Sequence, residues 1–171
     1  GDLHASQVMA ALQRRDPTAE FVYLGGDRMH TVSGVAPVID YRDMAFMGFS
    51  EVLRNLRRIS ANLRAAKEAL RTARPDVLVL IDYPSFNLKV AAEARRLGIP
   101  VAYYISPKVW AWKEWRVRTI KKLVDRMLVI FPFEVEYYKQ RHNYKVTYVG
   151  NPSVGEIDAA LAATPERATF M

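Results

Sequence analysis

The chain has 171 residues, of which half are hydrophobic and a quarter are charged, as is typical of a single globular domain with a sizeable core. It contains no cysteine, and its three histidines lie far apart in the sequence, so a disulfide scaffold and a thiol nucleophile are excluded and a metal site is not expected. The formal net charge is +7, and no apolar run reaches the ~18 residues that would indicate a membrane span.

The segments before Pro75 alternate between helical and extended patterns. Glycines flank the two short apolar runs, as expected of strands that end in turns. A later run has apolar residues three or four positions apart and ends before a proline, which predicts a long helix with Ser50 as its cap. The expected elements are a helix over 2–14, strands over 21–24 and 35–39, and a helix over 50–74.

The second half of the chain repeats a strand-then-helix order. The run VLVLI at 77–81 is apolar throughout, which indicates a strand buried on both faces of a parallel sheet. Strands that alternate with helices predict an α/β fold with a Rossmann-like, doubly wound parallel sheet. The remaining elements are helices over 88–97, 113–124, 133–140 and 154–163 and strands over 101–105, 127–131 and 146–149.

The order of the elements also indicates how the domain is organised. A doubly wound fold normally opens with a central strand, whereas the first element here is a helix, so we expect the first strand to be missing from this chain. That strand would lie between the strands over 21–24 and 77–81, and its loss would expose two sheet edges. We expect one domain over 1–161 and a linker over 162–171.

The loop over 82–87 directly follows the VLVLI strand, at the end of the sheet where doubly wound folds bind their ligands. Asp82 is the candidate general base, because a carboxylate beside apolar walls has a raised pKa. The alternative is that Asp82 caps the helix expected from residue 88. Asn87 is either a hydrogen-bond partner for a substrate or the cap of that helix, and the spacing favours the cap.

The loop over 106–112 follows the next strand and holds two tryptophans. Trp110 and Trp112 are candidates for stacking on a sugar or for lining an acyl-chain groove, and the alternative is burial against the sheet. Lys108 is a candidate phosphate contact or, alternatively, a solvent-exposed lysine. Both loops lie where such a sheet binds its ligands, so we expect the chemistry there.

Two basic blocks hold more than the whole net charge, because residues 51–74 and 108–126 each carry +5. Such blocks indicate an anionic partner or, alternatively, two solvated helix faces. No nucleic-acid-binding motif is present, so nucleic acid is not an expected partner. Apolar residues beside arginines suit the interface of an anionic bilayer, and the candidate membrane contacts are Met44, Phe46, Met47, Phe49, Arg54, Arg57 and Arg58.

Several motifs of the chain resemble those of one known family. The two most specific are IDYPSFN at 81–87 and SPKVWAW at 106–112. In their order and spacing the motifs resemble the lipid-A-disaccharide synthase family of Gram-negative bacteria along nearly the whole chain. The other matching stretches are GDLH at 1–4, GGDRM at 25–29, MGFSEVL at 47–53, FPFE at 131–134 and YVGNP at 148–152.

The resemblance implies the amino-terminal, acceptor-side half of an inverting GT-B glycosyltransferase of lipid A and lipopolysaccharide biosynthesis. Its donor would be UDP-2,3-diacylglucosamine and its acceptor 2,3-diacylglucosamine 1-phosphate, which would give the β-1,6-linked disaccharide 1-phosphate and UDP. The resemblance implies no metal or other cofactor. The UDP-binding half is outside this sequence, so the chain alone is expected to be inactive. The implied location is peripheral, on the inner face of the cytoplasmic membrane.

The resemblance also implies roles for individual residues. Asp82 matches the catalytic base that takes the proton of the acceptor's 6-hydroxyl. Two positions depart from the family's pattern, since Ser85 stands where some members have a second aspartate and Lys108 where many have serine. The alternatives are a GT-B enzyme for another lipid-linked sugar, against which both specific motifs argue, and a non-catalytic basic module that binds membrane or nucleic acid. The implied substrate contacts are Gly1, Asp2, Asn87, Ser106, Lys108, Trp110, Trp112 and Glu134.

Overall fold

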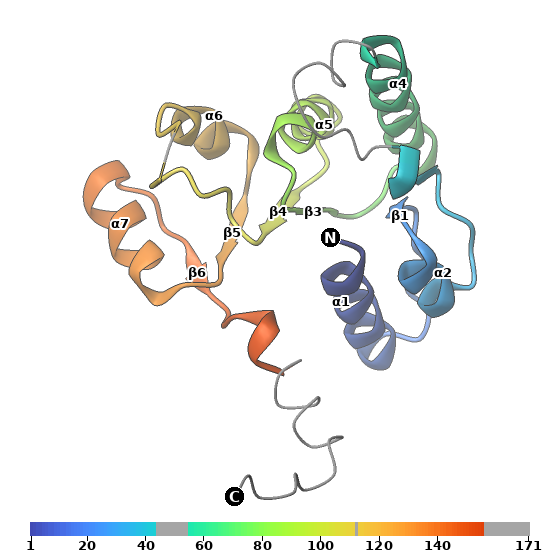
Figure 1. Cartoon of the computed structure of the whole chain (residues 1–171), viewed down its shortest axis with the longest axis horizontal. Coiled ribbons are helices and arrows are strands. Elements are labelled where there is room, and N and C mark those ends of the chain that lie inside the picture. Colours follow the sequence, from blue (N-terminus) through green and yellow to red (C-terminus); the bar gives the residue numbers. More distant parts are fainter. Residues whose placement is uncertain (44–54, 112, 156–171) are drawn as a thin grey trace, which may run out of the picture.

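The computed structural model describes residues 1–43, 55–111 and 113–155 (Figure 1). Helices and strands alternate along the chain, as the sequence predicts. The helices are α1 (Asp2–Arg15), α2 (Asp27–Ser33), α4 (Leu56–Ala73), α5 (Pro84–Arg96), α6 (Arg116–Leu123) and α7 (Pro132–His142), with a short 3-10 helix at Tyr41–Asp43. The strands are β1 (Leu24–Gly25), β2 (Ile39–Asp40), β3 (Leu78–Ile81), β4 (Val101–Tyr104), β5 (Arg126–Val129) and β6 (Thr147–Tyr148).

The larger sheet holds four parallel strands in the order β3-β4-β5-β6. Leu78 pairs with Val101 and Ile81 with Tyr104, so β3 and β4 run side by side over their full length. A helix connects each strand to the next, which brings every strand into the sheet in the same direction. This parallel α/β arrangement confirms the predicted Rossmann-like fold class.

A second, smaller sheet pairs β1 with β2 in parallel. Within the described chain, β1 and β3 form no hydrogen-bonded pair, and the amino terminus lies between them in Figure 1. Val79 in β3 is 38% exposed, whereas Tyr103 in β4 is fully buried. The division falls where the sequence places a missing central strand. The strands expected over 21–24 and 35–39 correspond to β1 and β2, which hold two residues each and extend one residue beyond the expected ranges.

The main core lies between the larger sheet and its helices. In Figure 1, α4, α5 and α6 lie in a row along one side of this sheet, and each contacts the next. Ala91 in α5, Ile120 in α6 and Val129 in β5 are fully buried there. A smaller cluster joins α1 and α2, and Ile81 packs against it from β3, so the larger sheet contacts both clusters.

Some element bounds differ from those that the sequence predicts. Sequence reasoning missed α2, which begins directly after the glycine pair at 25–26. α5 begins at Pro84 rather than at residue 88, because proline is well suited to the first position of a helix. The predicted cap Ser50, the helix beyond residue 155 and the linker lie outside the described residues. No described helix combines the length and the apolar character that a bilayer-spanning segment requires.

Candidate active site at the carboxyl edge of the sheet

The loops that follow β3, β4 and β5 lie at one edge of the larger sheet, because the three strands are parallel. The first carries Asp82, the second Ser106 and Trp110, and the third leads to Glu134 in α7. Residues from three separate motifs of the sequence therefore converge on one edge. This is the position at which doubly wound sheets bind ligands, so we take it as the candidate active site.

Asp82 is the first residue after β3, and its side chain is exposed. Asp82 and Tyr83 have φ angles of 48° and 43°, a left-handed conformation that costs a non-glycine residue about 1–3 kcal/mol. In the described part of the chain, no group bonds to the Asp82 carboxylate. An unpaired carboxylate in this position can accept a proton from a bound hydroxyl.

Two side chains hold the backbone that carries Asp82. The Tyr103 hydroxyl donates to the Asp82 carbonyl at 2.6 Å, and the Asn87 amide donates to the same oxygen at 2.6 Å and to the Ile81 carbonyl at 3.1 Å. Tyr103 is fully buried, and this burial raises the pKa of its phenol, so the hydroxyl remains a donor. Sequence reasoning missed Tyr103, because a tyrosine in a buried strand gives no indication of its hydrogen-bond partner.

The alternatives in which Asp82 or Asn87 caps a helix from residue 88 are wrong. The residue before the first turn of α5 is Tyr83, and Asn87 lies inside that turn. Its amide points back to the end of β3 instead of forward to free N–H groups. Asn87 therefore fixes the loop on which Asp82 stands. A direct contact between Asn87 and substrate stays a prediction.

Ser106 and Glu134 form a buried pair between β4 and α7. The Ser106 hydroxyl donates to Glu134 Oε1 at 2.6 Å, and the Phe131 N–H donates to Glu134 Oε2 at 3.1 Å. Ser106 is 5% and Glu134 is 1% exposed, so the carboxylate lies below the surface. Ile105 precedes the pair with a φ of 61°. Glu134 thus connects the loop after β4 to the start of α7.

An aromatic cluster lies beside this pair. Trp110 meets Phe133 edge-on with ring centroids 5.0 Å apart, and Phe133 stacks on Phe131 at 5.7 Å. Trp110 is 39% and Phe133 is 50% exposed, so the alternative of full burial against the sheet is wrong for Trp110. Lys108 is exposed, and Trp112 lies outside the described residues. Sequence reasoning missed Phe133, although it belongs to the FPFE stretch at 131–134.

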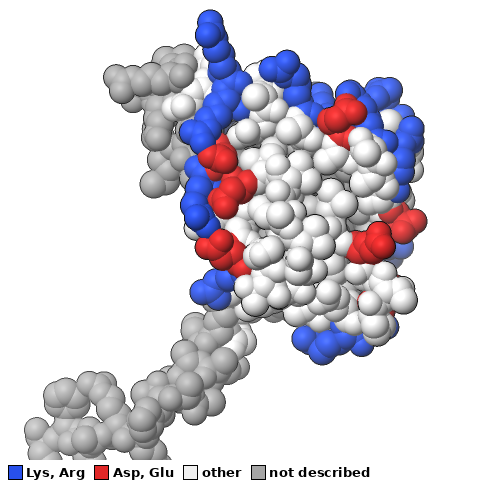
Figure 2. Space-filling view, turned by 90° about the vertical axis from the view of Figure 1, so that its right-hand side faces the viewer, with Lys and Arg blue, Asp and Glu red and all other residues white. Residues whose placement is uncertain are grey.

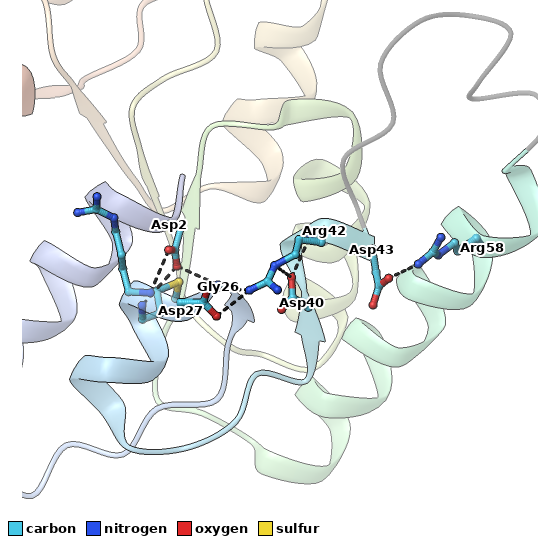
Figure 3. Close-up of polar contacts among 9 residues, drawn as sticks. Asp2, Gly26, Asp27, Asp40, Arg42, Asp43 and Arg58 are labelled. Atoms are coloured by element: carbon cyan, nitrogen blue, oxygen red, sulfur yellow. Dashed lines mark hydrogen bonds and ion pairs between the residues drawn. The ribbon is translucent and has the colours of Figure 1, made fainter.

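Asp2, a predicted substrate contact, belongs to α1, and its side chain lies at the start of α2 (Figure 3). Its carboxylate accepts the N–H groups of Gly26 at 2.8 Å, Arg28 at 3.2 Å and Met29 at 3.3 Å. A carboxylate in this position satisfies donors that the helix leaves unpaired. Asp2 therefore joins α1 to α2, and Gly1 is exposed at the start of α1. Substrate contacts by either residue stay predictions.

Most candidate membrane contacts lie outside the described residues, namely Met44, Phe46, Met47, Phe49 and Arg54. Arg57 and Arg58 are exposed in the first turn of α4, and Arg58 forms an ion pair with Asp43 (Figure 3). Figure 2 shows one face of the molecule on which lysines and arginines, together with several aspartates and glutamates, lie along the borders of an uncharged centre.

The described residues contain no group of three or more histidine, aspartate or glutamate side chains that could hold a metal ion. The candidate site presents the exposed carboxylate of Asp82, the half-exposed rings of Trp110 and Phe133, and neighbouring cations. This combination suits proton transfer from a hydroxyl of a ligand that has both polar and apolar surfaces.

Comparisons with known proteins give one consistent result. A model of the lipid-A-disaccharide synthetase family matches residues 1–169. Lipid-A-disaccharide synthases of Myxococcus xanthus and Geobacter metallireducens are 44% and 42% identical to the chain over 98% and 99% of its length. The chain spans only 43% and 44% of the length of these two relatives. Because the family model matches nearly every residue, the chain belongs to the lipid-A-disaccharide synthetase family.

Proposed function

We propose that the chain is the acceptor-side part of an inverting glycosyltransferase that makes the lipid A disaccharide. In this function 2,3-diacylglucosamine passes from its UDP derivative to 2,3-diacylglucosamine 1-phosphate, which gives the β-1,6-linked disaccharide 1-phosphate and UDP. The observation that carries the proposal is the exposed, unpaired carboxylate of Asp82 at the carboxyl edge of the sheet. The names of the relatives supply the reaction class.

In the proposed mechanism the Asp82 carboxylate takes the proton of the acceptor's 6-hydroxyl. The oxygen attacks the anomeric carbon of the donor as the bond to UDP breaks, and the leaving diphosphate takes up the electron pair of that bond. One displacement of this kind inverts the anomeric centre. Tyr103 and Asn87 support the step by holding the Asp82 backbone. Trp110 and Phe133 offer half-exposed rings for the sugar face or the first carbons of an acyl chain.

The part of the relatives that this chain does not cover bears on where the donor binds. The chain covers about two-fifths of each relative, as expected of one of two domains that face a common cleft. We therefore assign the UDP contacts to residues outside this chain and expect no turnover from the chain alone. Disaccharide formation by the isolated 171-residue chain would contradict this assignment.

We further propose that the protein works on the inner face of the cytoplasmic membrane, because both substrates are acylated. The exposed arginines at the start of α4 would face anionic headgroups. Sedimentation with phosphatidylglycerol vesicles, compared with phosphatidylcholine vesicles, tests this location. Replacing Arg57 and Arg58 by glutamine is expected to weaken binding to the anionic vesicles. Equal binding to both vesicle types would contradict the electrostatic part of the proposal.

The decisive experiment measures disaccharide formation by the full-length product of the gene that encodes this chain. We expect Asp82→Asn to lower kcat by about 10²- to 10⁴-fold, the usual contribution of a positioned general base. Asp16→Asn is the matched control, because Asp16 is exposed beyond the end of α1 and its carboxylate accepts hydrogen bonds from the neighbouring Thr18. Full activity of Asp82→Asn would refute the role of Asp82. Absence of disaccharide from the unaltered protein would refute the proposed reaction.

A further inference from the structure

Arg116 places a cation beside the loop that carries Asp82. It is the first residue of α6 and is half-buried, and its Nη2 donates to Ser85 Oγ at 3.2 Å. Ser85 lies three positions after Asp82 in the sequence. On its other side, the Arg116 guanidinium lies 5.6 Å from the centre of the Trp115 ring. The two contacts hold the guanidinium at the candidate site.

Tyr103 links Arg116 to Asp82 electrostatically. Burial raises the pKa of Tyr103, the negative charge of Asp82 raises it further, and the positive charge of Arg116 opposes the rise. Both charges therefore act on the same phenol, whose hydroxyl bonds to the Asp82 carbonyl. Through its bond to Ser85 in the first turn of α5, Arg116 lies close to the loop of Asp82, although 34 positions of sequence separate the two residues.

The guanidinium of Arg116 has no carboxylate partner. Among the residues that the structure describes, it meets only the neutral hydroxyl of Ser85 and the ring of Trp115. By contrast, Arg71 and Arg96 in the helices nearby are paired with Glu93. The guanidinium of a half-buried arginine that is held by neutral groups has most of its N–H donors available for a ligand.

The charge of Asp82 makes such a cation necessary for an anionic ligand. A phosphate brought close to an unpaired carboxylate is repelled, and the repulsion is strong where the surroundings exclude part of the water. An adjacent guanidinium offsets this repulsion and offers two parallel donors to phosphate oxygens. Lys108, the phosphate contact that the sequence suggested, is exposed and presents only a mobile point charge.

We propose that Arg116 binds the phosphate group of the acceptor and so selects a phosphorylated sugar. The proposal rests on the proposed function, because it takes its ligand from that reaction. It adds a binding residue that no motif of the sequence analysis included. A hydrogen bond between charged groups predicts that Arg116→Ala raises the acceptor KM by about 10- to 150-fold. The donor KM should stay unchanged.

The experiment compares two acceptors in the full-length protein: 2,3-diacylglucosamine 1-phosphate and the same sugar without its phosphate. Arg116→Ala should weaken use of the phosphorylated acceptor and leave use of the other acceptor within about twofold of the unaltered protein. Arg116→Lys should have an intermediate effect, because lysine keeps the positive charge and lacks the two parallel N–H donors of the guanidinium. Arg118→Ala is the matched control, since Arg118 is exposed on the same helix.

Several results would overturn the proposal. An equal loss with both acceptors would show that Arg116 acts on the structure of the site and not on the phosphate. A raised donor KM would assign Arg116 to the diphosphate of the donor instead. A phosphate-dependent loss in Lys108→Ala but not in Arg116→Lys or Arg116→Ala would move the contact to Lys108. Urea unfolding midpoints of each variant separate these results from a folding defect.

A binding measurement distinguishes failure of this proposal from failure of the proposed reaction. All three tryptophans of this chain lie at 110, 112 and 115, so its tryptophan fluorescence reports on the region around Arg116. Titration with glucosamine 1-phosphate should change the emission at lower concentration than titration with glucosamine, and Arg116→Ala should remove the difference. Absence of disaccharide formation by the full-length protein would refute the proposed reaction. The titration would still test whether Arg116 binds the phosphate group. Identical titration curves for Arg116→Ala and the unaltered protein would refute the proposal.

Discussion

Asn87 offers the sharpest test of how the site is built, because its amide joins the end of β3 to the first turn of α5. Asn87→Ala removes two donated hydrogen bonds, at 3.1 Å to the Ile81 carbonyl and at 2.6 Å to the Asp82 carbonyl. Asn87→Asp keeps the shape of the side chain and replaces the donor by a carboxylate that faces the same two oxygens. The two variants separate loss of a donor from added repulsion.

The size of the effect follows from these contacts. A hydrogen bond within a protein contributes about 0.5–1.5 kcal/mol net to stability. The Asp82 carbonyl keeps its bond from Tyr103, so the loss in Asn87→Ala should lie in the lower half of the range for two bonds, at about 1–2 kcal/mol. For a chain of this length, that corresponds to a fall in Tm of about 2–8 °C. Asn87→Asp should be less stable still at pH 7, because like-signed atoms face one another.

The assay is urea unfolding of each variant followed by circular dichroism, with kcat and acceptor KM measured in the full-length protein. We expect kcat to fall in both variants, because the left-handed backbone at Asp82 loses one of its two supports. Lys89→Ala is the control, since Lys89 is exposed on the same helix, and its effect should stay within about 0.5 kcal/mol. Unchanged stability in Asn87→Asp would refute the assignment of Asn87 as the residue that holds this loop.

Three further predictions concern stability. Ser106→Ala leaves the buried Glu134 oxygen without its donor and should lower the free energy of unfolding by about 1–3 kcal/mol, measured with urea. Hydrogen bonds from Arg96 and Arg71 lower the pKa of Glu93 to about 2, so this pairing should stabilise the chain above pH 4.5 and be lost as the pH falls toward 2 in acid titrations. Ile120→Ala should cost about 2–5 kcal/mol in thermal unfolding, and Ile120→Val about 0.5–1.5.

Each of these predictions has a contrary outcome. An unchanged urea midpoint in Ser106→Ala would mean that Glu134 does not depend on the serine hydroxyl. Glu93→Gln removes the titrating group. If the variant and the unaltered protein lose the same stability between pH 4.5 and 2, the loss comes from other carboxylates. Equal losses in Ile120→Val and Ile120→Ala would contradict the close packing of α6 on the sheet.

The sequence predicted the parts of the site that depend on local patterns. The VLVLI run indicated a buried parallel strand, and Asp82 follows β3 as expected. The strand-and-helix order predicted the parallel sheet, which in turn placed the loops after β3, β4 and β5 at one edge. The motifs at 81–87 and 106–112 indicated the family that the comparisons show. Such features can be predicted because burial pattern and motif spacing depend on residues that are close together in the sequence.

Only the tertiary structure decided which polar groups meet. Ser106 and Glu134 are 28 positions apart, Tyr103 and Asp82 are 21 apart, and Asp2 and Gly26 are 24 apart. The start of α5 at Pro84 changed Asn87 from a candidate cap into a support for Asp82. By itself, the sequence determined the fold class, the family and the candidate base. The partners of these residues depend on how separate strands and helices pack, and hydrogen bonds between distant residues leave no periodic signal in the sequence.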